Sequence, residues 1–257
     1  MRHCPKHHIA VCVDGTIILS LLPLADGCTA TGAGGSGRSG WVELFNGRDL
    51  TGWRPESSDK QNAWQPAAEV LPDPAAKDRK FVIKPGTGIL VNGPKGRAVD
   101  LLTETAYGDC QAHIEFMVAK RSNSGVYLQG RYELQIEDSF GKAPVESGDS
   151  GAIYERWIDG KGVDGTAPLV NASKPPGQWQ TFDIVFRAPR FDAAGKKTAN
   201  ACFVKVVHNG QVIHENVELN GPTRGAIGDS EVARGPLRLQ GDHGPIAYRN
   251  LRLRPLN

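Results

Sequence analysis

The feature that most constrains the fold is a two-residue alternation of apolar and polar side chains, which recurs in short runs from Trp41 onward. No stretch shows the sustained apolar period of an amphipathic helix. Turn markers separate the runs, and Asn209-Gly210 is the strongest hairpin signal among them. The expected strands are Trp41–Phe45, Phe81–Ile83, Gly88–Val91, Asp100–Thr103, Gln111–Val118, Gly125–Leu128, Tyr132–Glu137, Thr181–Arg187, Cys202–His208, Gln211–Val217, Leu237–Gln240 and Ile246–Leu253. Short strands at such intervals predict an all-β sandwich or barrel.

Composition agrees with this class and excludes one kind of partner. The chain has 31 Gly, 17 Pro and 39% hydrophobic residues, which is turn-rich but sufficient for a core. About 215 residues follow the N-terminal segment, so residues 41–257 are expected to form one domain. The net charge is +2 and the basic residues are scattered, so nucleic acid is not an expected partner.

The N-terminal segment predicts export. Arg2 and Lys6 precede an apolar stretch that is interrupted at Asp14 and Gly15, which is too short and broken for a spanning helix. We interpret residues 1–28 as a signal peptide, in preference to an interior strand, and residues 29–40 as a flexible linker. Leu24-Ala-Asp-Gly-Cys28 is similar to the lipidation motif of bacterial lipoproteins, with Asp26 as an extra residue. The expected location is therefore periplasmic, cell-surface or secreted, with membrane contact only through a lipid on Cys28.

Two cysteines lie inside the expected domain. Cys110 is in phase with Ile114 and Phe116, and Cys202 is in phase with Val206, so both thiols are expected on the core side of their strands. A disulfide between them is left open, because an oxidising compartment permits one but the sequence does not fix the pairing.

The strand Arg131–Asp138 is the first candidate for a carbohydrate-directed site. Alternation sends Tyr132, Leu134 and Ile136 inward and leaves polar residues on the opposite face. If the three strands around residues 113–137 are neighbours, one face would carry His113, Glu115, Tyr127, Gln129, Arg131, Glu133 and Gln135. Amides, carboxylates and aromatic rings are suited to sugar hydroxyls and to the C–H face of a sugar ring. The alternative is an ordinary solvated outer face.

Carboxylate spacing argues against a conventional glycosidase on this strand alone. Glu133 and Glu137 lie about 13 Å apart at strand rise, which exceeds the separation of paired catalytic carboxylates. A second carboxylate would have to come from Glu104, Glu115 or Asp138. His243, within Gln240-Gly-Asp-His-Gly244, is accessible for acid–base chemistry or metal ligation, and the alternative for it is a turn histidine. The long segment Ser139–Gly177 has few strand signals and is expected to be a functional or poorly ordered loop.

A series of ordered blocks resembles the 3-keto-disaccharide hydrolase family. The blocks are Leu44-Phe-Asn-Gly-Arg-Asp-Leu-Thr-Gly-Trp53, Leu102-Thr-Glu104, Tyr107-Gly-Asp109, Asn123-Ser-Gly-Val-Tyr-Leu128, Tyr132-Glu-Leu-Gln-Ile136, Gly151-Ala-Ile-Tyr154, Asn171-Ala-Ser-Lys-Pro-Pro-Gly-Gln-Trp179, Phe182-Asp-Ile-Val-Phe-Arg-Ala-Pro-Arg-Phe191, Gly235-Pro-Leu-Arg-Leu-Gln240, Asp242-His-Gly244 and Arg249-Asn-Leu251. Two residues depart from the pattern. Gly241 is inserted before Asp-His, and Cys110 stands where an aromatic residue is usual.

The resemblance implies a concanavalin A-like jelly roll of two antiparallel sheets, acting on carbohydrate as its substrate. It also implies cleavage of 3-keto-glycosides by hydrolysis or by β-elimination and rehydration. Glu133 or His243 is then the expected base, and a neighbouring Arg or a divalent cation is the expected enolate stabiliser, with Glu133 and His243 as candidate metal ligands. The expected substrate-binding residues are Glu104, Tyr127, Gln129, Arg131, Gln135, Tyr154 and Arg187. The alternatives are a non-catalytic carbohydrate-binding module and a structural envelope domain.

Overall fold

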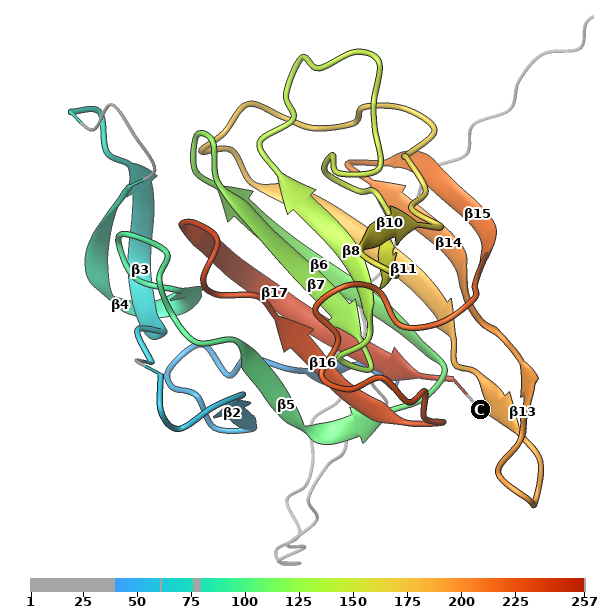
Figure 1. Ribbon diagram of the computed structural model, residues 1–257. Helices are drawn as coiled ribbons and strands as arrows, with labels where there is room; N and C mark the ends of the chain where they lie inside the picture. The colour runs from blue at the N-terminus through green and yellow to red at the C-terminus, as the bar shows by residue number, and fades with distance from the viewer. Residues whose placement is uncertain (1–39, 61, 76–79, 257) are drawn as a thin grey trace, which may run out of the picture. The chain divides into compact units, whose positions relative to one another are not determined.

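The three-dimensional structure is a computed structural model that describes residues 40–60, 62–75 and 80–256 (Figure 1). These residues form strands and loops without helices, and accordingly no helix among them could cross a membrane. Contacts join Ser39–Asn257 into one compact unit. The expected signal peptide and residues 29–39 of the expected linker lie outside the described residues.

Two antiparallel sheets make up most of this unit. In order across the larger sheet, its strands are β15 (Gln211–Leu219), β14 (Ala201–His208), β11 (Gln180–Arg187), β6 (Cys110–Val118), β17 (Ile246–Pro255), β4 (Phe81–Val91) and β3 (Gln65–Pro72), and β1 (Val42–Glu43) pairs with β17. The smaller sheet has the order β2 (Trp53–Pro55), β5 (Leu101–Tyr107), β16 (Gly235–Leu239), β7 (Asn123–Leu128) and β8 (Tyr132–Glu137). Two short ribbons pair β9 (Arg156–Ile158) with β10 (Lys161–Val163), and β12 (Arg190–Phe191) with β13 (Lys197–Ala199).

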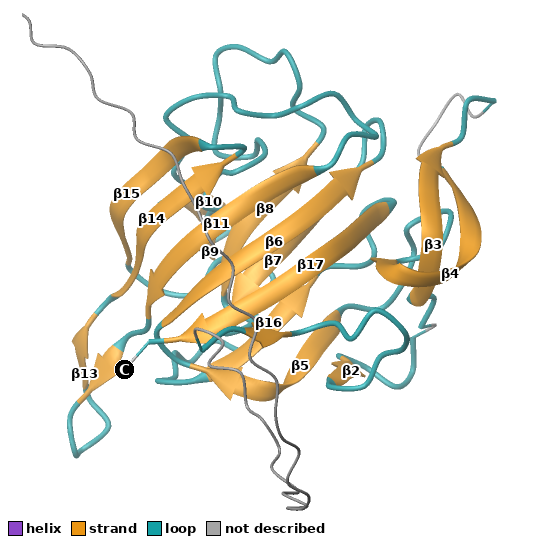
Figure 2. Ribbon diagram, turned by 180° about the vertical axis from the view of Figure 1, so that it is seen from behind, coloured by secondary structure: helices purple, strands orange, loops and turns teal. Residues whose placement is uncertain are grey.

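The two sheets pack face to face. Figures 1 and 2, taken from opposite sides, show β7, β8 and β16 over β6, β11 and β17, first in front of them and then behind. Tyr132 of β8 contacts Phe186 of β11 across the interface, with ring centroids 5.5 Å apart. The expected inward residues of β8 are fully buried in this core. The prediction of a two-sheet antiparallel sandwich is therefore confirmed.

Local sequence also fixes one hairpin as expected. Asn209 and Gly210 join β14 to β15, and both have positive φ, at 49° and 82°. A two-residue hairpin loop favours this conformation because its twist matches that of the flanking strands.

The assumption that three polar rows share one face is wrong. β6 belongs to the larger sheet, whereas β7 and β8 belong to the smaller one. The chain crosses between the sheets in the short connection from β6 to β7. As a result, His113 pairs with Asp183 and Glu115 pairs with Arg249, both on the outer face of the larger sheet.

The expected side of the strand is confirmed for Cys110 and wrong for Cys202, although Cys202 is also buried, at 3% exposed. Cys110 lies in the core, but in β14 the core side chains are Ala201 and Phe203, and Cys202 lies beside Arg187 instead. An irregularity between β11 and β14 inserts one residue at Val204 and reverses the alternation, so that Cys202 and Val206 face opposite ways. Both thiols are free, so the disulfide left open by the sequence does not form.

Candidate functional site

Glu133 is the central residue of the candidate site. Alternation along β8 turns its side chain away from the core, yet only 2% of the residue is exposed, because loops cover this face of the smaller sheet. Glu133 lies opposite Tyr127 in the pairing of β7 with β8. The neighbouring Gly125 leaves room for the carboxyl group, since a Cβ there would lie only 2.1 Å from Glu133 Oε1.

Burial changes the acidity of Glu133. Desolvation raises the pKa of its carboxyl group to about 8, while a hydrogen bond from Tyr127 and the charges of Arg238 and His243 oppose the rise. A carboxyl group of this kind is largely protonated at neutral pH. When it does ionise, it is a much stronger base than an exposed glutamate.

A polar cavity of about 270 Å³ opens onto this carboxyl group. Its lining comes from β7, β8, the end of β16 and three loops: Asn123, Tyr127, Glu133, Gln135, Tyr154, Arg224, Gly225, Gln240 and His243. Gln240 Oε1 is buried and has no hydrogen-bond partner among the described residues. Glu133 is the one carboxylate in this lining.

His243 stands at the open side of the cavity, in the connection from β16 to β17. Its side chain is 57% exposed, and its Nδ1 lies 2.5 Å from Asp242 Oδ1. This hydrogen bond is the main reason that the pKa of His243 is raised above its ordinary value. The hydrogen bond to Asp242 therefore favours the protonated imidazole over the neutral one.

Gly241, close to this histidine in the chain, is held by hydrogen bonds to its backbone. Its backbone N–H donates to Asp100 Oδ1 at 2.8 Å, and its carbonyl accepts from Asn92 Nδ2 at 2.9 Å. A Cβ at this position would meet the carbonyl oxygens of Val99 and Ala98 at 2.7 and 2.8 Å. Glycine thus permits a close backbone approach here, and His243 still lines the cavity.

A buried ion pair between Arg238 and Asp100 stabilises the wall of the cavity. Arg238 Nε donates to Asp100 Oδ2 at 2.7 Å, and both side chains are almost fully buried. The guanidinium carbon of Arg238 lies 4.4 Å from the centroid of the Tyr127 ring, and Nη1 of the same group donates to the carbonyl of Gly225. Arg238 consequently holds two parts of the cavity wall in place.

The opposite wall is a loop segment, Gly221–Gly225, fixed against β8. Thr223 Oγ1 accepts from the Glu133 N–H at 3.1 Å and donates to the Arg131 carbonyl at 3.0 Å. The next residue, Arg224, donates its backbone N–H to the carbonyl of Glu155 at 2.8 Å. These bonds bring the Arg224 side chain to the cavity.

The structure gathers some of the expected site residues and separates others. Glu133, Gln135, Tyr127, Tyr154 and His243 line one cavity. Among the rest, Arg187 pairs with Glu218 on the larger sheet and Glu104 is exposed on β5. Gln129 and Arg131 hold the loop that follows Arg224, by hydrogen bonds of 3.0 Å to the Ala233 carbonyl and 2.6 Å to the Ser230 carbonyl.

Sequence reasoning missed four lining residues. Asn123 is in phase with Tyr127 on β7, and Gln240, which directly follows β16, is in phase with Arg238, so alternation offered a signal for both. Arg224 and Gly225 lie in a loop without periodicity, and no sequence signal marked them.

The described residues do not form a preassembled metal centre. No group of three or more His, Cys, Asp or Glu side chains gathers in the part of the chain that the structure describes. The cavity brings Glu133 and His243 together with neutral amides, which is fewer charged donors than dedicated protein sites for zinc or calcium use. The divalent cation expected from the resemblance therefore does not match this donor set.

Comparison with known proteins identifies the family. A family model described as the 3-keto-alpha-glucoside-1,2-lyase-like domain matches residues 40–254. A candidate glycosyl hydrolase from Parabacteroides distasonis is 28% identical, with a TM-score of 0.59 over 85% of this chain and 84% of that chain. A second candidate glycosyl hydrolase from that organism is 17% identical, with a TM-score of 0.55 over 85% and 94% of the two chains, and shows the shared fold. No curated protein matches. Since the family model covers nearly the whole described unit, the chain belongs to the 3-keto-alpha-glucoside-1,2-lyase-like domain family.

Proposed function

We propose that the protein cleaves the glycosidic bond of 3-keto-glycosides by β-elimination across C1 and C2, followed by addition of water. The observation that carries this proposal is a single buried carboxyl group with a raised pKa, facing a histidine–aspartate pair in a polar cavity. Family membership and the likeness to a candidate glycosyl hydrolase support a glycoside as the substrate.

The chemistry of a 3-keto sugar suits one base. The keto group acidifies the proton on C2, so ionised Glu133 takes that proton and the electron pair moves to the C3 oxygen as an enolate. The Arg224 side chain lines the cavity and would donate hydrogen bonds to this oxygen, while the Tyr127 hydroxyl group donates to ionised Glu133.

Expulsion of the aglycone completes the elimination. The C3 carbonyl re-forms, C1 and C2 become doubly bonded, and the C1–O bond breaks. Protonated His243 gives its proton to the departing oxygen, and its hydrogen bond to Asp242 supports that protonation state. Water then adds across C1 and C2, which gives the free 3-keto sugar and makes the net reaction a hydrolysis.

This reaction matches the site better than a two-carboxylate mechanism does. Asp100 is a further acid whose charge acts on Glu133, but it is engaged by Arg238 and the Gly241 N–H. A retaining or inverting glycosidase needs two carboxyl groups flanking the scissile bond. One base with an acid partner is sufficient for elimination.

Incubation of the purified protein with a 3-keto-glucoside that carries a chromogenic aglycone tests the proposal. We expect release from the native protein, with or without chelator, and loss of release in Glu133→Gln and His243→Ala proteins that remain folded. In D₂O, rehydration should place deuterium at C2 beyond the level found when the product is incubated alone. Full activity in both variants would refute the assignment. Absence of release together with measurable glycan binding would favour a carbohydrate-binding module.

A further inference from the structure

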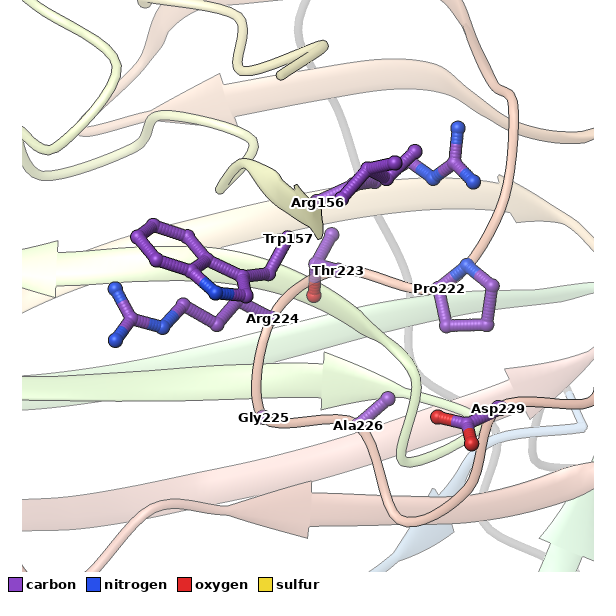
Figure 3. Close-up of a pocket in the computed structure, with 9 residues that line it drawn as sticks. Arg156, Trp157, Pro222, Thr223, Arg224, Gly225, Ala226 and Asp229 are labelled. Carbon is purple, nitrogen blue, oxygen red and sulfur yellow. The ribbon is translucent and has the colours of Figure 1, made fainter. Parts of the chain in front are cut away.

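A second cavity adjoins the one that contains Glu133, and the two share a wall. It has a volume of about 450 Å³ and lies between the β9–β10 ribbon and the loop after β15 (Figure 3). Arg224 and Gly225 line both cavities. The remaining lining consists of Arg156, Trp157, Ile158, Pro222, Thr223, Ala226 and Asp229.

Packing of the hydrophobic core does not account for Trp157, which lines this second cavity. The residue is 48% exposed and belongs to neither hydrophobic core cluster of the described residues. The Arg224 guanidinium carbon lies 4.0 Å from the centre of the indole, and Figure 3 shows the two side chains next to each other. This contact fixes the ring in place while leaving much of its surface open. A half-exposed indole with a fixed orientation offers a flat apolar surface to a ligand ring.

The wall between the cavities is itself rigid. Thr223 is buried and bonded to the β8 backbone on one side of Arg224, and Gly225 accepts from Arg238 on the other. A substrate that reaches from one cavity to the other would therefore cross a fixed boundary beside Arg224.

Size indicates which part of a substrate each cavity holds. The cavity with Glu133, at about 270 Å³, is at or below the roughly 300–1,000 Å³ typical of ligand sites, so one sugar ring would fill much of it. A substrate with a second ring has to extend past Arg224. The second cavity supplies an apolar platform in Trp157 and polar groups in Arg156 and Asp229 at that place.

We propose that the cavity around Trp157 is the aglycone subsite, which binds a ring with one apolar face, either a second sugar or an aromatic group, by stacking on Trp157. This inference rests on the function proposed above, because it places the reacting 3-keto ring beside Glu133. Trp157 is then a specificity-determining residue and takes no part in bond cleavage.

The test compares 3-keto-glucosides with methyl, glucosyl and nitrophenyl aglycones on the full-length native protein and on the Trp157→Ala and Trp157→Phe variants. In Trp157→Ala we expect kcat/KM to fall about 3- to 10-fold for the two ring-bearing substrates, as loss of an aromatic contact predicts, and to stay within about 2-fold for the methyl glycoside. Trp157→Phe should keep most of the preference for rings. The glucosyl and nitrophenyl arms report whether a sugar face, an aromatic ring or both are accepted.

Phe140→Ala is the matched control. Phe140 is a 55% exposed aromatic residue in the same segment as Trp157, Ser139–Gly177, but it lines neither cavity. It should leave all three substrates unchanged. An equal effect of Trp157→Ala on methyl and ring aglycones, or no effect on either, would overturn the subsite.

A binding measurement separates this inference from the proposed function. Should the native protein cleave none of the three substrates, the proposed reaction fails, and calorimetric titration with the unoxidised nitrophenyl glucoside judges the subsite alone. Weaker binding by Trp157→Ala than by the native protein would support it. Equal or undetectable binding would overturn it.

Discussion

Replacement of Gly125 by alanine gives the sharpest test of the position of Glu133. Gly125 does not have a positive φ, so an alanine backbone is unstrained there. The new Cβ would nevertheless lie 2.1 Å from Glu133 Oε1 and 2.9 Å from its Cδ, where ordinary contacts begin near 3.4 Å. The carboxyl group must consequently move by about 1 Å or more, and a displacement of that size at a reacting group costs roughly 100-fold in rate.

The same substitution should hardly change stability. Alanine within a strand is favoured over glycine by about 0.5–1 kcal/mol, because an unfolded chain with glycine has more conformational freedom to lose on folding. This gain offsets part of the cost of moving Glu133. We therefore expect kcat/KM to fall about 100-fold while the free energy of unfolding, measured by urea denaturation, changes by less than about 1 kcal/mol.

Gly148→Ala is the matched control, because a Cβ there meets nothing within 4 Å and its φ is ordinary. A shorter acid gives a second control: Glu133→Asp should cost less activity in the Gly125→Ala background than in the native protein, since the two changes act on the same space. Undiminished activity in Gly125→Ala, or a loss matched by unfolding, would refute the placement of the carboxyl group.

Four further predictions follow, two from Glu133, one from the buried ion pair and one from the N-terminal segment. With Glu133 as the proposed base and His243 as the proposed acid, log kcat/KM should pass through a maximum with pH, because Glu133, whose pKa is about 8, must be ionised while His243 must be protonated; any residual activity of Glu133→Gln should lack the limb that belongs to Glu133. Folding raises the pKa of Glu133, so its ionisation is unfavourable in the folded state and the native protein loses stability as pH rises from 4.5 to about 8. Glu133→Gln lacks this group, so its urea midpoint should increase relative to that of the native protein over the same range. Urea midpoints that change in parallel with pH in the two proteins would contradict the raised pKa. Arg238→Met leaves Asp100 buried without its partner and should lower the free energy of unfolding by about 3–5 kcal/mol. Addition of Asp100→Asn should restore part of that loss. If the effects of the two substitutions on the free energy of unfolding simply add, the two residues are not coupled. Export with a lipid on Cys28 remains a prediction. It is checked by comparing how the native protein and Cys28→Ala partition into a detergent phase, and equal partitioning of the two proteins would contradict it.

Alternation in the sequence was enough to predict most of the long strands and a sandwich or barrel, whereas the two-sheet jelly roll was implied by the family resemblance and β3 (Gln65–Pro72) was not predicted. Alternation also placed Tyr127, Glu133 and Gln135 on the face that forms the cavity. These features depend on residues two apart, which a period of two captures directly.

Features that depend on distant pairings were not predictable in the same way. No local pattern indicates that β6 and β7 belong to different sheets, because a short connection can either form a hairpin or cross a sandwich. The extra residue at Val204 reversed the phase of Cys202 without a local signal. Asp100 and Arg238 are 138 residues apart and meet only after the strands β5 and β16 have paired.

The outer edge of β8 has a consequence for self-association. β8 ends the smaller sheet, and Gly151–Tyr154 binds along its free side: Gly151 N–H donates to the Gln135 carbonyl at 2.8 Å, and Tyr154 N–H donates to the Glu133 carbonyl at 3.1 Å. An uncovered edge strand is a template for pairing with another molecule. The segment that carries Tyr154 into the cavity thereby also blocks such pairing. Variants that loosen this segment should therefore both disturb the cavity at Tyr154 and expose an edge strand that favours aggregation.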